Sequence, residues 1–244
     1  MRVLKNRADT IYVWKHINLN RSRMLLFMVL LVLAFMLFIM NTYPFAQMGL
    51  LLIPLSYGLG LYTYRKMVAW TMGATGELRV VEELSKLDDG YILLNNVVVP
   101  PNWGDADHII LGPNGLFVVE TKAVGGSVEC NGDSWSRFKV GGRGFSYPVK
   151  IGNPSSQVKR NAKSLKDLVL KHGSEIFQGT VPHIWVHAGV VFTNDDLNLK
   201  VENPTVSVLR LHEVVDYIKS EKSKFKYSEK QLSRMASVIL RESS

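Results

Sequence analysis

Two uncharged apolar runs lie near the start of the chain, and shorter strand-like and helix-like patterns alternate after them. Residues 24–40 read MLLFMVLLVLAFMLFIM, without charge, glycine or proline, and residues 45–64 form the second run. As a helix, the first run spans about 26 Å, close to the ~30 Å hydrocarbon core of a bilayer. Because it is apolar on every face, it has no side to present to water. The pattern therefore predicts a two-helix transmembrane hairpin.

Positive charge flanks this hairpin on its outer sides. Arg21 and Arg23 precede the first run, Arg65 and Lys66 follow the second, and the loop 41–44 is uncharged. By the positive-inside rule, both termini and the soluble part are expected on the cytoplasmic side of the inner membrane. The alternatives are a cleaved signal peptide and a buried hairpin of a soluble protein. No small-residue cleavage site follows the first run, and another apolar run does, which argues against a signal peptide. The first run has no polar face to show to solvent, which argues against a soluble hairpin.

Beyond residue 66 the pattern predicts a mixed α/β domain, in which helical spacing alternates with short β-rich runs. The expected helices are 75–87, 154–171, 211–220 and 228–241, and the expected strands are 91–99, 107–111, 116–122, 184–192 and 205–209. Residues 127–130 are expected to continue the sheet and 135–147 to form a further hairpin. The predicted divisions are a basic N-terminal segment (1–23), the transmembrane hairpin (24–66), the soluble domain (67–210) and C-terminal helices packed on it (211–244).

The net charge of +8 does not by itself indicate nucleic-acid binding. The first 66 residues hold eight of the 29 basic side chains and one of the 21 acidic ones, so the remainder is nearly neutral. A hydrophobic content of 47% excludes global disorder. The single cysteine, Cys130, excludes a disulfide scaffold and fits a reducing compartment.

Three chemically active side chains are expected to meet at one end of a β-hairpin. The segment 112–115 reads GPNG, a strong turn signal between two strands. With the two middle residues at the tip of the turn, Asp107 faces Glu120, and Lys122 shares the face of Glu120. This register is an assumption, because a bulge in the turn would shift one strand against the other.

Such a cluster has a clear chemical use. Two close carboxylates repel each other unless a cation neutralises them, and oxygen ligands with open water positions suit Mg²⁺ or Mn²⁺. Asp107, Glu120 and the carbonyl of Thr121 are the candidate ligands. Lys122 is placed either to position a metal-bound water or to offset negative charge in the transition state. The pattern supports metal-assisted phosphodiester hydrolysis. The alternative is an exposed cross-strand salt bridge.

These residues belong to an ordered set that resembles the NERD domain, a nuclease-related family of the PD-(D/E)XK restriction-endonuclease-like superfamily. The matching residues are Gly76-Glu77, Asp107-His108, Gly115, Phe117, Glu120-Thr121-Lys122, Gly126, Trp135, Pro154, Gln157 and Val190-Val191-Phe192. The resemblance implies a mixed sheet flanked by helices, metal ligation by Asp107 and Glu120, and a catalytic amine at Lys122. In one departure, Ala106 stands where the superfamily motif has proline, a position that supplies no ligand.

Two helix residues are further candidates for this site. Glu77 aligns with Val81 and Leu84 on the apolar side of its expected helix, which points it toward the sheet. The alternative is a first-turn carboxylate that complements the helix dipole. Gln157 resembles the polar helix residue of the superfamily and is expected to contact Lys122 or a phosphate. Its alternative is a position on a solvated helix face.

The sequence thus predicts a membrane-anchored, Mg²⁺- or Mn²⁺-dependent nuclease that hydrolyses DNA, or RNA, and meets the bilayer through residues 24–64. The first alternative is a catalytically silent module that binds nucleic acid or a protein partner at the membrane. The intact set of Asp107, Glu120 and Lys122 argues against a loss of catalytic residues. The nearly neutral charge of the soluble part argues against strong general affinity for DNA. The second alternative is a membrane-assembly protein whose hairpin carries the function.

Overall fold

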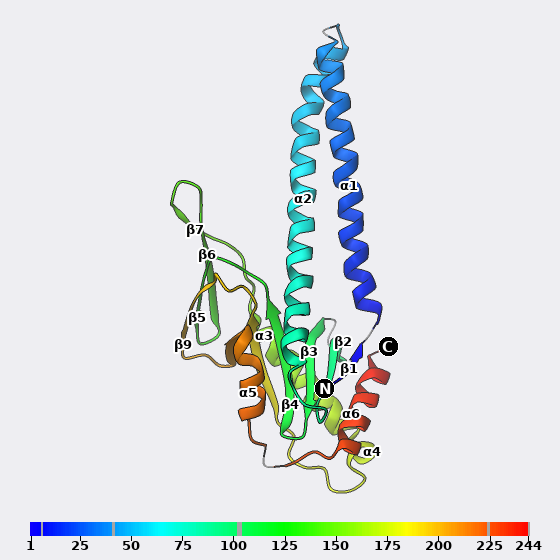
Figure 1. Cartoon of the computed structure of the whole chain (residues 1–244), viewed down its shortest axis with the longest axis vertical. Helices are drawn as coiled ribbons and strands as arrows, with labels where there is room; N and C mark the ends of the chain where they lie inside the picture. The colour runs from blue at the N-terminus through cyan, green and yellow to red at the C-terminus, as the bar shows by residue number, and fades with distance from the viewer. Residues whose placement is uncertain (6, 41, 102–103, 224, 244) are drawn as a thin grey trace. The chain divides into compact units, whose positions relative to one another are not determined.

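The chain divides into two units, which are described separately. The computed structural model describes residues 1–5, 7–40, 42–101, 104–223 and 225–243. One unit is Arg7–Ala74, and the other combines Met1–Asn6 with Thr75–Ser244. Figure 1 shows the helices and strands of both.

The unit Arg7–Ala74 is built from two long helices, α1 (Arg7–Ile39) and α2 (Phe45–Leu84), the second of which continues into the other unit. The span Trp14–Ile39 has a mean hydropathy of 2.6, and the most apolar window of α2 reaches 1.3. In the most apolar stretch of each helix, only 6% of the first and 11% of the second is buried. The core helix of a soluble protein would be mostly buried. Both helices are therefore long and apolar enough to cross a membrane.

A glycine allows the two helices to approach closely. A Cβ atom on Gly49 would lie 2.6 Å from the Ala34 carbonyl oxygen and 2.6 Å from the Phe38 nitrogen. Small residues at such a crossing are typical of helix pairs in membranes, where close backbone packing replaces the hydrophobic effect. Elsewhere along the pair, the rings of His16 and Trp70 stack with their centroids 4.9 Å apart.

The α2 helix corrects the prediction of two separate elements at 45–64 and 75–87. It runs without a break from Phe45 to Leu84, through Pro54, and ends three residues before the predicted end. Glycine and proline lowered the helical signal in the sequence, but helices in membranes tolerate both. Glu77 consequently lies deep within a long helix, so its alternative role as a first-turn partner of the helix dipole is wrong.

The second unit contains a six-stranded sheet in the order β1-β2-β3-β4-β8-β10. Its strands are β1 (Arg2–Lys5), β2 (Ile92–Val98), β3 (Asp105–Gly112), β4 (Gly115–Lys122), β8 (Val186–Phe192) and β10 (Ser207–Arg210). The β2–β3–β4 pairs are antiparallel, whereas β1 and β8 pair in parallel with β2 and β4, and β10 in parallel with β8. The mixed α/β class is confirmed, and β1 is a strand that the sequence pattern did not indicate.

A separate four-stranded sheet follows β4 along the chain, in the order β7-β6-β5-β9. Its strands are β5 (Ser127–Asn131), β6 (Ser134–Val140), β7 (Ser146–Pro148) and β9 (Asn198–Glu202). The expectation that residues 127–130 continue the first sheet is therefore wrong, because these residues pair with β6 and β9. The hairpin predicted at 135–147 is confirmed as β6 and β7.

Helices cover both faces of the six-stranded sheet (Figure 1). The last turns of α2 and the helix α5 (Val214–Ser220), which follows the short 3₁₀ turn Leu211–Glu213, pack on one face. The helices α3 (Pro154–Lys171), α4 (Gly173–Phe177) and α6 (Glu229–Glu242) pack on the other. This three-layer arrangement buries β3 and β4 at the centre of the unit.

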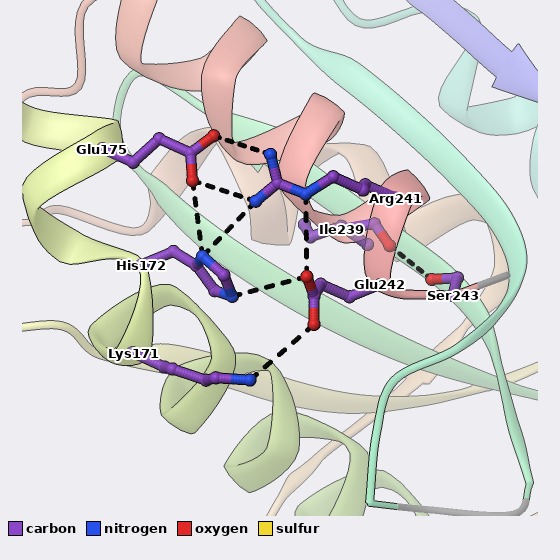
Figure 2. Close-up of polar contacts among 7 residues, drawn as sticks. All are labelled: Lys171, His172, Glu175, Ile239, Arg241, Glu242 and Ser243. Atoms are coloured by element: carbon purple, nitrogen blue, oxygen red, sulfur yellow. Dashed lines mark hydrogen bonds and ion pairs between the residues drawn. The ribbon is translucent and has the colours of Figure 1, made fainter.

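The C-terminal helix α6 is joined to α3 and α4 by a network of ion pairs (Figure 2). The Arg241 guanidinium donates two hydrogen bonds of 2.9 Å to the Glu175 carboxylate, and His172 Nδ1 lies 3.4 Å from the same carboxylate. On the other side, Glu242 lies 3.8 Å from the ammonium of Lys171. The hydrogen bonds from Arg241 lower the pKa of Glu175 to about 2.

The Arg241→Ala substitution is expected to destabilise the chain at neutral pH but not in acid. Because the pKa of Glu175 falls from 4.5 to about 2 on folding, the stabilisation is fully present above pH 4.5 and is lost as the pH falls through about 2. Urea unfolding of the full chain in detergent should give a lower midpoint for the variant near pH 7, with a deficit that shrinks below pH 4.5.

The matched control for this measurement is Lys163→Ala, which removes an exposed ion pair of 3.1 Å with Asp167 inside one helix. Such a pair contributes little, so its midpoint should stay close to that of the unmodified chain. If the urea midpoint of Arg241→Ala stays below that of the unmodified chain by the same amount from pH 7 to pH 2, Arg241 acts through packing instead of charge.

Candidate active site

The β3–β4 hairpin has the register that its turn predicts. Cα partners run from Gly112 and Gly115 at the turn to His108 and Val119, with no bulge. Asp107 and Glu120 are the next residues on the two strands, and the Thr121 N–H donates a hydrogen bond of 2.6 Å to Asp107 Oδ2. The predicted register is therefore confirmed up to the end that carries the candidate residues.

A lysine and two hydrogen-bond acceptors meet at this end of the hairpin. Lys122 Nζ donates to Glu120 Oε1 at 2.5 Å and to Gln157 Oε1, on α3, at 3.1 Å. The side chains of Lys122 and Glu120 are only 18% and 6% exposed. The alternative of an exposed cross-strand salt bridge is therefore wrong, and so is the placement of Gln157 on a solvated face.

A glycine in α2 brings the fifth candidate residue, Glu77, onto the end of β4. A Cβ atom on Gly76 would lie 2.6 Å from Ala123 Cβ and 3.0 Å from Thr193 Oγ1, so only glycine permits this contact without displacement. Glu77 follows directly, and its charge is close enough to Asp107 to raise the pKa of that carboxyl group. All five predicted site residues thus gather around one strand end.

The electrostatics of the site are dominated by crowded carboxylates. The pKa of Asp107 is held well above its ordinary value, first by burial and then by the negative charge of Glu120, with Glu77 adding to the effect. The Thr121 N–H and the charge of Lys122 act in the opposite direction without cancelling it. Excess negative potential of this kind favours the binding of a cation.

No group of three or more His, Cys, Asp and Glu side chains is arranged around a common metal position, as far as the described residues go. Beyond Asp107 and Glu120, the predicted oxygen donor is the backbone carbonyl of Thr121, which lies between Glu120 and Lys122 in β4. A magnesium ion is commonly held by one or two carboxylates, with waters and substrate phosphates filling its other positions. The donor set fits such an ion.

On the opposite face of the sheet, a buried histidine fixes the backbone behind the site. His108 is 1% exposed, and its Nδ1 and Nε2 lie 2.7 Å from Asn95 Oδ1 and 3.0 Å from Thr121 Oγ1. Burial lowers the pKa of His108 to about 3, so the ring is neutral. Because an amide oxygen only accepts, Nδ1 carries the proton and Nε2 accepts from the Thr121 hydroxyl.

Sequence reasoning missed Asn95, the partner of His108. The signal was a pair of asparagines in the middle of the apolar strand YILLNNVVV, where an unpaired amide would be costly. The second of these, Asn96, has a φ of 53°, in the left-handed region that non-glycine residues rarely adopt. The β2–β3 register places Asn96 opposite Asp107, and backbone strain of this kind clusters at functional sites.

The protein thus combines a mixed sheet flanked by helices with a carboxylate pair and a lysine at the end of its central hairpin. The chain belongs to the nuclease-related domain (NERD) family, which matches residues 72–193, half of its length. This interval runs from just before Gly76 to just after β8 and includes every residue of the cluster.

Two relatives among curated proteins match parts of the chain. The probable kinase PglW of Streptomyces coelicolor is 30% identical over 144 residues, which is 57% of this chain and 8% of that protein. An uncharacterized protein of Bacillus anthracis is 40% identical over 109 residues, which is 43% of this chain and 50% of that protein. The chain thus spans half or less of the length of these relatives. No solved structure matches it.

Asn95→Ala is expected to destabilise the folded chain, because it leaves His108 Nδ1–H buried without an acceptor. The cost of such a group is about 1–3 kcal/mol, measurable by urea unfolding of the full chain in detergent. Asn131→Ala is the control, since Asn131 is exposed on β5 and its amide lies 3.5 Å from Glu202. Equal stability of the two variants would contradict a structural role for the His108 network.

Proposed function

We propose that the chain is a membrane-anchored, divalent-metal-dependent nuclease that hydrolyses phosphodiester bonds of DNA, and also RNA where it is accessible. The observation that carries the proposal is the convergence of Asp107, Glu120 and Lys122 at one strand end, with Gln157 on the lysine and Glu77 beside the carboxylates. A purely structural ion pair would need only Glu120 as the partner of Lys122. The further carboxylates, Asp107 and Glu77, are explained if the site binds a cation and a phosphate.

Asp107 and Glu120, together with the carbonyl of Thr121, would hold Mg²⁺ or Mn²⁺. The support is their oxygen-only chemistry and the environment of Asp107, whose pKa is raised first by burial and then by the negative charge of Glu120. When bound, the ion would polarise the scissile phosphate and make a nearby water more acidic.

The chain's own residues then have distinct tasks. Lys122 is held between Glu120 and Gln157, so its ammonium is fixed where it can donate a hydrogen bond to a phosphate oxygen as negative charge grows there. Glu77 lies on the α2 side of the carboxylates and orients the attacking water. His108 does not react, since it is neutral and faces away, but it fixes Thr121 and the strand end.

The family name supports nuclease-related chemistry, and the choice of DNA as the first substrate follows the family resemblance. The kinase named in Streptomyces coelicolor is matched over only 8% of its length, so its kinase activity gives no reason to propose the same for this chain. A module that binds nucleic acid without cleaving it is the competing function, and the intact carboxylate–lysine set argues against it.

We also propose a two-pass topology in the cytoplasmic membrane, with both termini and the catalytic unit in the cytoplasm. The support is the pair of apolar helices and the basic residues on the outer side of each apolar run.

Asp107→Asn, Glu120→Gln and Lys122→Ala are each expected to reduce divalent-dependent cleavage by about 10²-fold or more, because each removes charge that acts on the phosphate or the cation. The measurement is cleavage of plasmid DNA and of RNA by the purified full chain in detergent with Mg²⁺. Removal of the ion with EDTA should abolish cleavage by the unmodified chain.

Lys163→Ala serves as the control, because the Lys163 side chain is 79% exposed on α3 and forms an ion pair with Asp167 of the same helix. Circular dichroism should show the same helix content for all variants. Full activity in both carboxylate variants, or cleavage that persists in EDTA, would overturn the nuclease proposal.

Membrane insertion predicts that the chain stays with membranes in carbonate and in high salt and is released only by detergent. A Tyr43→Cys variant should react with a membrane-impermeant maleimide from outside intact cells, whereas Ser220→Cys should react only after lysis. The native Cys130 is buried and should not interfere. Release without detergent would contradict the transmembrane assignment, and the reverse labelling pattern would contradict the topology.

A further inference from the structure

The hairpin formed by β6 and β7 carries basic and aromatic side chains that the proposed catalytic site does not use. Between residues 137 and 150 there are four basic side chains and no acidic one, in a soluble part that is nearly neutral as a whole. Phe145 is 77% exposed and Tyr147 is 47% exposed. Single exposed aromatic residues are common, but these two stand together with the basic residues.

The strand register places these side chains on one face of the hairpin. Lys139 pairs directly with Tyr147, and the Gly141 N–H donates a hydrogen bond of 2.9 Å to the Phe145 carbonyl, which extends the pairing toward the tip. Since alternate residues share a face, Arg137 and Lys139 lie on the same side as Phe145 and Tyr147. These four residues are called the basic aromatic face. Val140 and its partner Ser146 lie on the other side.

The base of the hairpin packs against the chain just beyond the catalytic strand. Arg137 Nε donates a hydrogen bond of 3.0 Å to the carbonyl of Gly125, three residues after Lys122. Gly126 has a φ of 98°, and a Cβ atom there would collide with the Phe138 carbonyl oxygen and lie 3.3 Å from Lys139 Cγ. The basic aromatic face therefore begins beside the residues that follow the active site.

We propose that the basic aromatic face binds single-stranded nucleic acid and guides it to the end of β4, an inference that rests on the proposed nuclease function. Bases stack on exposed aromatic rings while lysine and arginine neutralise the phosphates, which is the chemistry of sequence-tolerant single-strand binding. An anionic membrane surface fits the face less well. The four residues of the turn, Gly-Gly-Arg-Gly, carry no apolar side chain, and the exposed apolar residues that flank it, Val140 and Phe145, lie on opposite faces of the hairpin, so they form no common apolar surface to insert.

The test is the affinity of the full chain in detergent for a fluorescent oligothymidine of about 20 nucleotides, measured by anisotropy in EDTA. Phe145→Ala combined with Tyr147→Ala should raise the Kd at least about tenfold, because two stacking platforms are lost. Lys139→Gln should lower the slope of log affinity against log salt by about 0.7, the value for one phosphate contact on a single strand.

Val140→Ala is the matched control, since Val140 is 72% exposed on the same hairpin but on its other face. Its Kd should stay within about twofold of the unmodified chain, and circular dichroism should be the same for every variant. An unchanged Kd in the double aromatic variant, an equal loss in the Val140→Ala control, or absence of binding by the unmodified chain would each overturn the proposal.

Binding in EDTA separates this proposal from the proposed nuclease function. If the chain binds the oligonucleotide through the basic aromatic face but does not cleave with Mg²⁺, the nuclease proposal is refuted and the binding proposal is supported. If the chain cleaves but the double aromatic variant binds normally, the nuclease proposal is supported and the binding proposal is refuted. In reconstituted vesicles, a polarity-sensitive dye on Phe145→Cys should respond to the oligonucleotide. A dye signal of a lipid environment, unaffected by the oligonucleotide, would assign the face to the membrane and overturn the proposal.

Discussion

The end of strand β4 concentrates negative charge where little water is present to screen it. Glu120 is 5% exposed, and the pKa of Asp107 is raised above its ordinary value first by burial and then by the charges of Glu120 and Glu77. Like charges this close repel strongly at low effective dielectric constant. Lys122 offsets part of the repulsion through its hydrogen bond to Glu120 Oε1. The surrounding structure must therefore hold these groups together against their own repulsion until a cation or a substrate relieves it.

Three features of the structure hold the cluster in place. The β3–β4 register sets Asp107 against the Thr121 N–H. Gly76 lets α2 approach Ala123 closely enough to bring Glu77 to the site. On the far face, His108 ties Thr121 to β2 through Asn95. Because each feature fixes a different strand or helix, the cluster depends on the fold as a whole and cannot be produced by the E-x-K motif alone.

The hairpin and its cluster could be predicted from sequence because their signals are local. A GPNG turn between two apolar strands fixes the pairing, and alternation places Lys122 beside Glu120. The strands β1 and β9 escaped prediction because they pair in parallel with β2 and β5, far away in the sequence, and are too short for a clear alternation. The His108–Asn95 contact is also non-local, although two asparagines in an apolar strand were a visible signal.

The basic side chains that suit membrane anchoring and those that suit substrate binding lie in different parts of the chain. Eight of the 29 basic side chains lie in the first 66 residues, around the two apolar runs, where they suit a lipid surface. Non-specific attraction to nucleic acid grows with the number of phosphates that a protein neutralises, so the nearly neutral soluble part gathers little substrate by charge alone. On the second proposal, the four basic residues of the segment 137–150 would supply local affinity next to the site. Taken together, the two proposals predict that the chain acts on strands that can reach both the hairpin and the end of β4, which favours single-stranded ends and gaps over continuous duplex.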